Sequence, residues 1–217
     1  MINGGIFVFG GYGRGGHLLP GAKDHGLIQP MGSGGGAGGG AGPGASGALS
    51  LAAVVLFNTG VDANRDQISG NVSDLHWISS GTGPNIISPP LAVAALEALW
   101  IPDLDSLESK WVAMSSGTEL IGPTPRVVEY RTTMILSGTP PPNLQVDLRF
   151  ACDNSVNEFL VNSGRFIISG GPFPIWTNQV LSGGFQSGTN WIAARAVNTE
   201  DDSPHGLRVE FTGISHG

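Results

Sequence analysis

The chain has 217 residues, of which 17 are acidic and 10 are basic, so that its formal net charge is −7. Surfaces that bind nucleic acid need clustered lysine and arginine, and an acidic chain argues against that role. The only cysteine, Cys152, excludes an intrachain disulfide and a thiolate metal cluster. Its place on the apolar side of an alternating segment favours a small buried hydrophobe over a reactive nucleophile.

The first 47 residues form a glycine-rich arm. Nineteen of the 35 glycines lie in residues 1–50, where side chains are too sparse to build a core. Such a segment can be fixed by close backbone approach to another copy or a neighbouring subunit, and a simple linker is the alternative. We predict an arm that binds partners through its few bulky side chains, which are Ile6, Phe7, Val8, Phe9, Tyr12, Leu18 and Leu19.

Neither an export signal nor a membrane anchor is predicted from the sequence. The amino terminus has no basic flank, and its run of bulky apolar residues, Ile6 to Phe9, is shorter than a secretory signal requires. No stretch approaches the roughly 18 apolar residues of a membrane span. A secreted protein read from a wrong start codon is the alternative explanation.

A second unit, residues 48–217, begins with an apolar run that ends at Asn58 to Gly60. The length and apolarity of residues 48–60 predict a buried strand, and residues 74–79 predict a second strand. Residues 91–100 follow two prolines and precede Pro102. Their composition predicts a short helix.

The later segments alternate apolar and polar residues with a period of two. This pattern covers residues 127–136, 144–152 and 207–212, and a stiff proline-rich turn joins the first two. Strands with one apolar and one polar side are typical of antiparallel sheets that share a core. We therefore predict an all-β protein with eight or more strands in two antiparallel sheets, preceded by the extended arm.

Eight short motifs occur in a fixed order along residues 54–213, and together they carry a family resemblance. They are Asn58–Asp62, Asp74 with His76 and Trp77, Ser109–Trp111, Tyr130–Thr133, Asp153–Asn154, Val161–Gly164, Gly184–Asn190 and Gly206–Glu210. In these motifs the chain resembles the jelly-roll, galactose-binding-like sandwich modules of exosortase-sorted bacterial surface proteins and of glycosidase sugar-binding domains. The resemblance implies a jelly-roll sandwich and no catalytic activity.

Three groups of polar or aromatic residues are candidate sites. Asp153 and Asn154 can bind paired sugar hydroxyls or close a local turn, and the structural role is favoured. Trp176 lies between turn-rich segments and is the tryptophan most suited to a surface position, where it could stack on a sugar, although packing is favoured. Side-chain oxygens at alternate positions form a weak Ca²⁺ candidate, although a plain polar turn is favoured. They belong to Asp62, Asn64 and Asp66.

Nothing in the spacing of the five histidines or of the serines predicts catalysis, so we expect a non-enzyme without a cofactor. The leading hypothesis is a virion structural protein, a bacteriophage capsid decoration or fibre-type protein. Its arm would contact other copies of itself, as a dimer or trimer, and major capsid proteins. The alternative is a carbohydrate-binding or adhesive module of a bacterial surface or secreted protein. Both allow contact with host glycans, and neither involves nucleic acid or a membrane.

Overall fold

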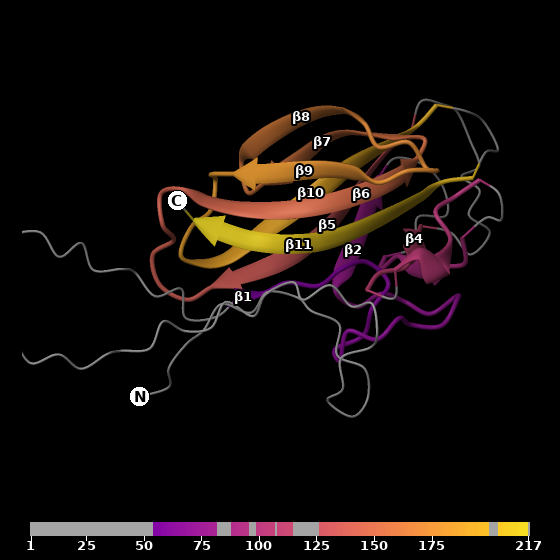
Figure 1. The fold of residues 1–217 in the computed structure, drawn as a ribbon, viewed down its shortest axis with the longest axis horizontal. Helices are drawn as coiled ribbons and strands as arrows, with labels where there is room; N and C mark the ends of the chain where they lie inside the picture. The colour runs from indigo at the N-terminus through magenta and orange to yellow at the C-terminus, as the bar shows by residue number, and fades with distance from the viewer. Residues whose placement is uncertain are drawn as a thin grey trace, which may run out of the picture.

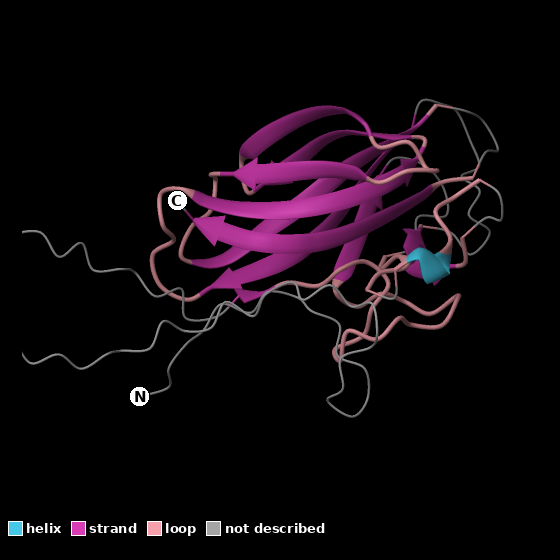
Figure 2. Ribbon diagram, viewed as in Figure 1, coloured by secondary structure: helices cyan, strands magenta, loops and turns pink. Residues whose placement is uncertain are grey.

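The structure, a computed structural model, describes residues 54–81, 88–95, 99–106, 108–114, 126–199 and 204–216. The glycine-rich arm lies outside these ranges, and so do the bulky side chains predicted to bind partners. Within them the chain forms eleven strands and one 3₁₀ turn, η1 at Asp103–Asp105 (Figure 2). The strands are β1 (Val54–Val55), β2 (Trp77–Gly81), β3 (Leu91–Val93), β4 (Trp111–Ala113), β5 (Arg126–Leu136), β6 (Leu144–Asp153), β7 (Ser155–Val161), β8 (Gly164–Gly170), β9 (Thr177–Ser182), β10 (Gly188–Asn198) and β11 (Gly206–His216).

The strands form two sheets that pack face to face, with β9, β6 and β11 in front of β10 and β5 in Figure 1. One sheet has six strands in the order β1-β5-β10-β7-β8, and β2 also pairs with β5. The other has five strands in the order β3-β4-β11-β6-β9. All pairings between these strands are antiparallel. The predicted all-β, two-sheet antiparallel sandwich of jelly-roll type is confirmed.

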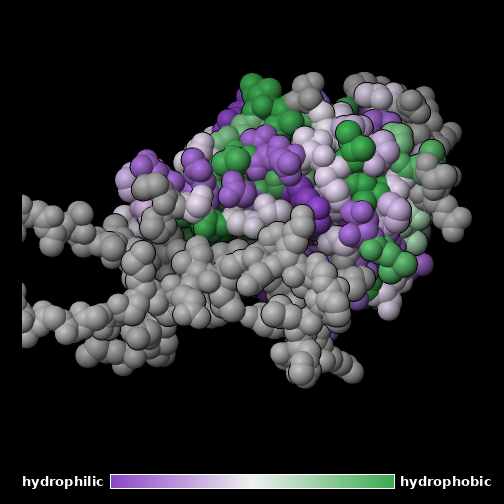
Figure 3. Space-filling model, in the orientation of Figure 1, coloured by the Kyte–Doolittle hydropathy of each residue, from purple (hydrophilic) through white to green (hydrophobic). Residues whose placement is uncertain are grey.

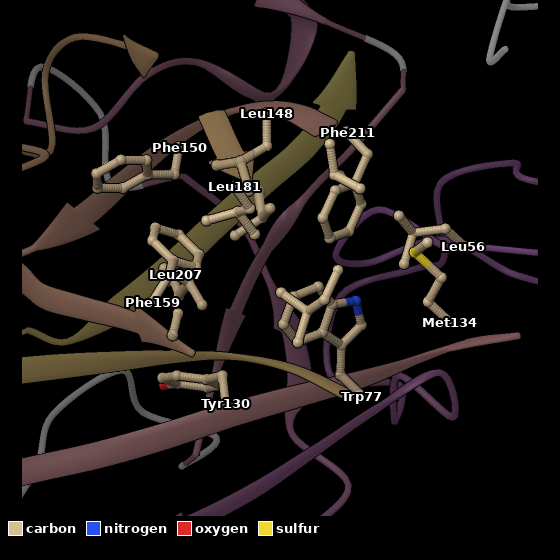
Figure 4. Packing of buried hydrophobic residues seen from close by; sticks show 14 of the residues in the cluster. Leu56, Trp77, Tyr130, Met134, Leu148, Phe150, Phe159, Leu181, Leu207 and Phe211 are labelled. Carbon is tan, nitrogen blue, oxygen red and sulfur yellow. The ribbon is translucent and has the colours of Figure 1, made fainter. Parts of the chain in front are cut away.

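The alternating pattern places the core as predicted. In β5 every second residue from Arg126 to Leu136 is buried, and in β6 Leu144, Val146, Leu148 and Phe150 point into the sandwich. Aromatic rings fill its centre (Figure 4): Phe150 meets Phe159 edge to face at 5.1 Å between centroids. Burial of this apolar surface is the main favourable contribution to folding.

The predicted helix over residues 91–100 is wrong where the structure describes it. Leu91–Val93 is strand β3, which pairs with β4, and Ala94 and Ala95 are irregular. Ala92 and Val93 are buried in the sheet, so tertiary packing overrides the helix propensity of an alanine-rich segment. Among the described residues, no helix is long and apolar enough to span a bilayer.

The segment between β1 and β2 is fixed by a buried carboxylate. Asp74 accepts hydrogen bonds from the backbone amides of Gly60 at 2.6 Å and His76 at 3.0 Å. Burial raises the pKa of Asp74 to about 6, although backbone hydrogen bonds from Gly60, His76 and Trp77 act in the opposite direction. The Asp-x-His-Trp motif therefore holds the loop that leads into β2.

Candidate functional site

Trp176 immediately precedes β9, and its indole contacts three charged side chains. The ring is half-buried, and its Nε1 donates to Oδ2 of the exposed Asp105 at 2.8 Å. The guanidinium carbons of Arg149 and Arg208 lie 4.4 Å and 5.1 Å from the ring centroid. A cation over an indole face is attractive, most of all when it is shielded from water. The ring is thus held in one position.

Below Trp176 lies a buried polar network centred on Arg208. Its Nε donates to the Ser109 hydroxyl at 2.7 Å, and its terminal nitrogens donate to the carbonyls of Pro102 at 2.9 Å and Ser106 at 2.8 Å. The Ser109 hydroxyl in turn donates to Glu210 at 2.6 Å. Burial lowers the pKa of Arg208, and the negative charge of Glu210 opposes that effect.

Glu210 connects this network to the surface. Its second oxygen accepts a hydrogen bond from Nε of Arg149 at 2.6 Å, and the Arg149 side chain keeps about 31% of its surface exposed. One continuous set of charge-assisted bonds therefore runs from the interior to the side chain that flanks Trp176.

Polar side chains continue from Arg149 along the outside of the five-stranded sheet. In the register of β6 with β9, Arg149 faces Asn178, Asp147 faces Val180, and Gln145 faces Ser182. We call these residues, with Trp176, the polar face. In Figure 3 the side chains over β9 and β6 are largely hydrophilic or neutral, with single hydrophobic residues among them. Guanidinium, amide, carboxylate and hydroxyl groups beside one aromatic ring can recognise a hydroxylated ring compound.

Asp153 and Asn154, the other residues predicted for glycan binding, engage partners within the chain. Asp153 accepts from Nε1 of Trp100 at 2.8 Å and from Nδ2 of Asn154 at 3.0 Å. The Asn154 side-chain oxygen accepts from the backbone amide of Thr199 at 3.0 Å. Trp176 packs on the apolar cluster that contains Trp100, and Asp153 bonds to Trp100, so these two residues are connected to the same cluster. Glycan contact by the Asp153–Asn154 pair stays a prediction.

The Ca²⁺ candidate has the geometry of a polar turn. Asp62 Oδ1 accepts from the backbone amides of Asn64 at 2.8 Å and Asp66 at 3.0 Å, which is an Asx-turn arrangement. Among the residues that the structure describes, no three His, Cys, Asp or Glu side chains are grouped so that they could hold a metal ion.

Arg149, Asp105 and Arg208 are the site residues that sequence reasoning missed. Arg149 and Arg208 stand at polar positions of alternating segments, so a surface location is the natural expectation for both. Arg208 is instead completely buried under Trp176. The Gly-Leu-Arg-Val-Glu motif singles out the segment that contains Arg208. Its periodicity does not show that the loop with Pro102 and Ser106 covers this side chain.

Comparisons with known proteins give little further information. No protein family and no curated protein matches the chain. A solved structure of a family 11 carbohydrate-binding module from Clostridium thermocellum, in complex with a β-1,3-1,4-mixed-linked tetrasaccharide, is similar with 12% identity and a TM-score of 0.36. The similarity covers 69% of this chain and 92% of that module.

Proposed function

We propose that the protein is a non-catalytic carbohydrate-binding module that holds a glycan on its polar face beside Trp176. The observation that carries this proposal is the fixed indole: Trp176 is tethered to Asp105 and packed on two guanidinium groups, yet it stays partly open to solvent. A ring that is already ordered loses little conformational freedom when a ligand stacks on it.

The neighbouring groups fit the two kinds of surface that a pyranose offers. Its C–H face is apolar and can lie on the indole, while its hydroxyls need planar donors and acceptors around the rim. Arg149 and the exposed Asn178 supply donors, and Asp147 supplies a carboxylate on the same strand pair. Because these residues lie on adjacent strands of one sheet, their spacing is set by rigid elements.

Glycan binding also supports the proposal of an extracellular or surface-exposed location. The hypothesis of a virion protein depends on the arm, which lies outside the described residues, and it stays a prediction. A module that binds host glycans would be compatible with either setting.

Binding to a panel of soluble polysaccharides, followed by affinity electrophoresis and calorimetry, tests the proposal. We expect Trp176→Ala to weaken binding of the selected glycan by about tenfold or more, the loss of roughly 1.4 kcal/mol of stacking. Asn178→Ala removes an exposed amide and should weaken binding less, without affecting folding. Trp191→Ala, on the other sheet, is the matched control and should bind as the unaltered protein does.

Two results would argue against the proposal. One is the absence of saturable binding across neutral and charged polysaccharides. The other is a glycan whose affinity falls with Trp191→Ala but not with Trp176→Ala or Asn178→Ala. Chromatography of the incubated glycan checks the non-catalytic part, since a shortened product would identify an enzyme.

A further inference from the structure

A second surface feature lies on the six-stranded sheet, where two short strands share one edge of β5. Strand β1 pairs with Ile135 and Leu136, and β2 pairs with residues 128–132. The strands leave Thr133 and Met134 between them, and a pocket of about 230 Å³ opens at this place. Its lining residues are Val55, Phe57, Leu75, His76, Thr132, Thr133 and Ile135.

The pocket combines aromatic and aliphatic side chains with the polar residues Thr132 and Thr133, and the Arg65 guanidinium carbon lies 5.3 Å from the Phe57 ring centroid. Phe57 and His76 stack with ring centroids 3.6 Å apart and planes 4° from parallel. Around them, Val55 is 46% exposed, Leu75 79% and Ile135 51%. Burial lowers the pKa of His76, which favours the neutral ring at pH 7. An exposed group of large aliphatic side chains around an aromatic pair is typical of a surface that another apolar segment covers.

The position of the pocket in the chain points to its occupant. The described structure begins at Val54, next to the lining residue Val55, and residues 1–53 come before it in the sequence. Those residues contain the bulky run Ile6–Phe9, whose sequence is IFVF. We propose that the pocket binds the Ile6–Phe9 segment of the chain's own amino-terminal arm.

The size and side-chain spacing of the segment match the pocket. A cavity of about 150 Å³ accepts a benzene molecule, so one phenyl ring fits within the volume present here. In an extended segment alternate residues share one side, which places Phe7 and Phe9 together. One ring can then enter between Phe57 and Ile135 while the other covers the aliphatic rim.

The connection is long enough, and it favours the same chain over a second copy. Residues 10–53 join the segment to β1. A random coil of this length and glycine content spans on the order of 35 Å, so reach does not limit docking. A tether of this kind gives an effective concentration near the millimolar range, well above that of a second copy in dilute solution.

A nitroxide label at Asn3→Cys tests this assignment in the full chain. The native Cys152 is completely buried and burial raises its pKa, so the label reacts selectively at the new cysteine. We expect strong broadening of the NMR signals of Val55, Leu75 and Ile135, unchanged on dilution. Ile167, which is 83% exposed on β8 at the opposite edge of the sheet, is the control and should stay sharp.

Variants on both sides of the contact complete the experiment. Phe7→Ser with Phe9→Ser, and separately Leu75→Ser in the pocket, should each remove the broadening. The proposal is overturned if the label broadens the signals of the pocket residues no more than the signal of Ile167. So does broadening that arises only when labelled chains are mixed with isotope-labelled chains, because that result assigns the segment to a second copy.

Discussion

The roles of the tryptophans follow from the partner that each indole N–H reaches. Trp77 donates to the carbonyls of Phe57 and Asn58 at 3.2 Å, and Trp111 donates to that of Ile101 at 2.9 Å. Both side chains are fully buried, and a backbone partner lets them fill the interior without an unsatisfied donor. Trp176 instead reaches the carboxylate of Asp105 at the surface. Because this partner lies at the surface, the Trp176 ring stays partly exposed, as the proposed stacking on a glycan requires.

At the residue scale, Gly171 is a position that only glycine fits. Its φ is +87°, and a Cβ there would lie 2.1 Å from Cε2 of the buried Phe150. We expect Gly171→Ala to lower the free energy of unfolding by about 3 kcal/mol, from steric displacement plus backbone strain. Urea unfolding measures this change.

Gly138→Ala is the matched control for Gly171. Gly138 has the same φ of +87°, but a Cβ there meets nothing within 4 Å. Gly138→Ala should therefore lower the free energy of unfolding only by the backbone strain, roughly 1 kcal/mol. Equal losses for the two variants would show that the contact with Phe150 is not the cause.

At the element scale, the sequence predicts the long strands well and the short ones poorly. The segments that alternate apolar and polar residues form β5, β6 and β11. Such a strand has one apolar side, and only one orientation places that side against the core. Residues 91–93 have no such alternation, and they form a strand because they pair with β4 and also bond to residues 71–73. For the candidate site, the turn-rich segments around Trp176 indicated its position near the surface, but its arginine neighbours come from contacts between β6, β11 and a loop.

The network around Glu210 ties β11 to β6 and to the loop before β4. Glu210→Gln keeps the shape of the side chain but removes its negative charge. That charge lies near the buried Arg208, and the same carboxylate accepts a hydrogen bond from Arg149. We expect a loss of about 3 kcal/mol in the free energy of unfolding, because the buried Arg208 loses its strongest counter-charge.

Glu129→Gln provides the comparison for Glu210. Glu129 pairs with Arg131 and Arg195, whose side chains are 37% and 39% exposed. Water and salt screen those pairs, so the variant should lose 1 kcal/mol or less. The result would contradict this account if urea unfolding showed the same loss for both variants.

At the scale of the whole molecule, the two proposed surfaces lie on different sheets. The polar face belongs to β6 and β9, and the pocket belongs to the edge of β5. Two sheets of a sandwich expose opposite outer sides, so docking of the arm leaves the polar face open. The arm experiment and the glycan experiment can therefore fail independently.

The fold also combines two buried groups whose titrations oppose each other. Burial lowers the pKa of His205, which stacks with Tyr130 at 5.8 Å, to about 4, against an ordinary 6.5. Burial raises the pKa of Asp74 from 3.8 to about 6. His205 contributes stability that is present above pH 6.5 and lost as pH falls to 4, while Asp74 contributes stability that is present below pH 3.8 and lost as pH rises to 6.

Between pH 4 and 6 the two slopes, each about 1.4 kcal/mol per pH unit, cancel in the unaltered protein. We expect His205→Phe to remove the histidine slope, so that stability relative to the unaltered protein rises by about 3 kcal/mol from pH 6.5 to 4. Asp74→Asn should show the reverse, a relative loss of similar size from pH 6 to 4. Urea unfolding at four pH values measures both difference curves. Because the prediction concerns slopes, a constant offset from altered packing does not affect it, whereas parallel curves for all three proteins contradict it.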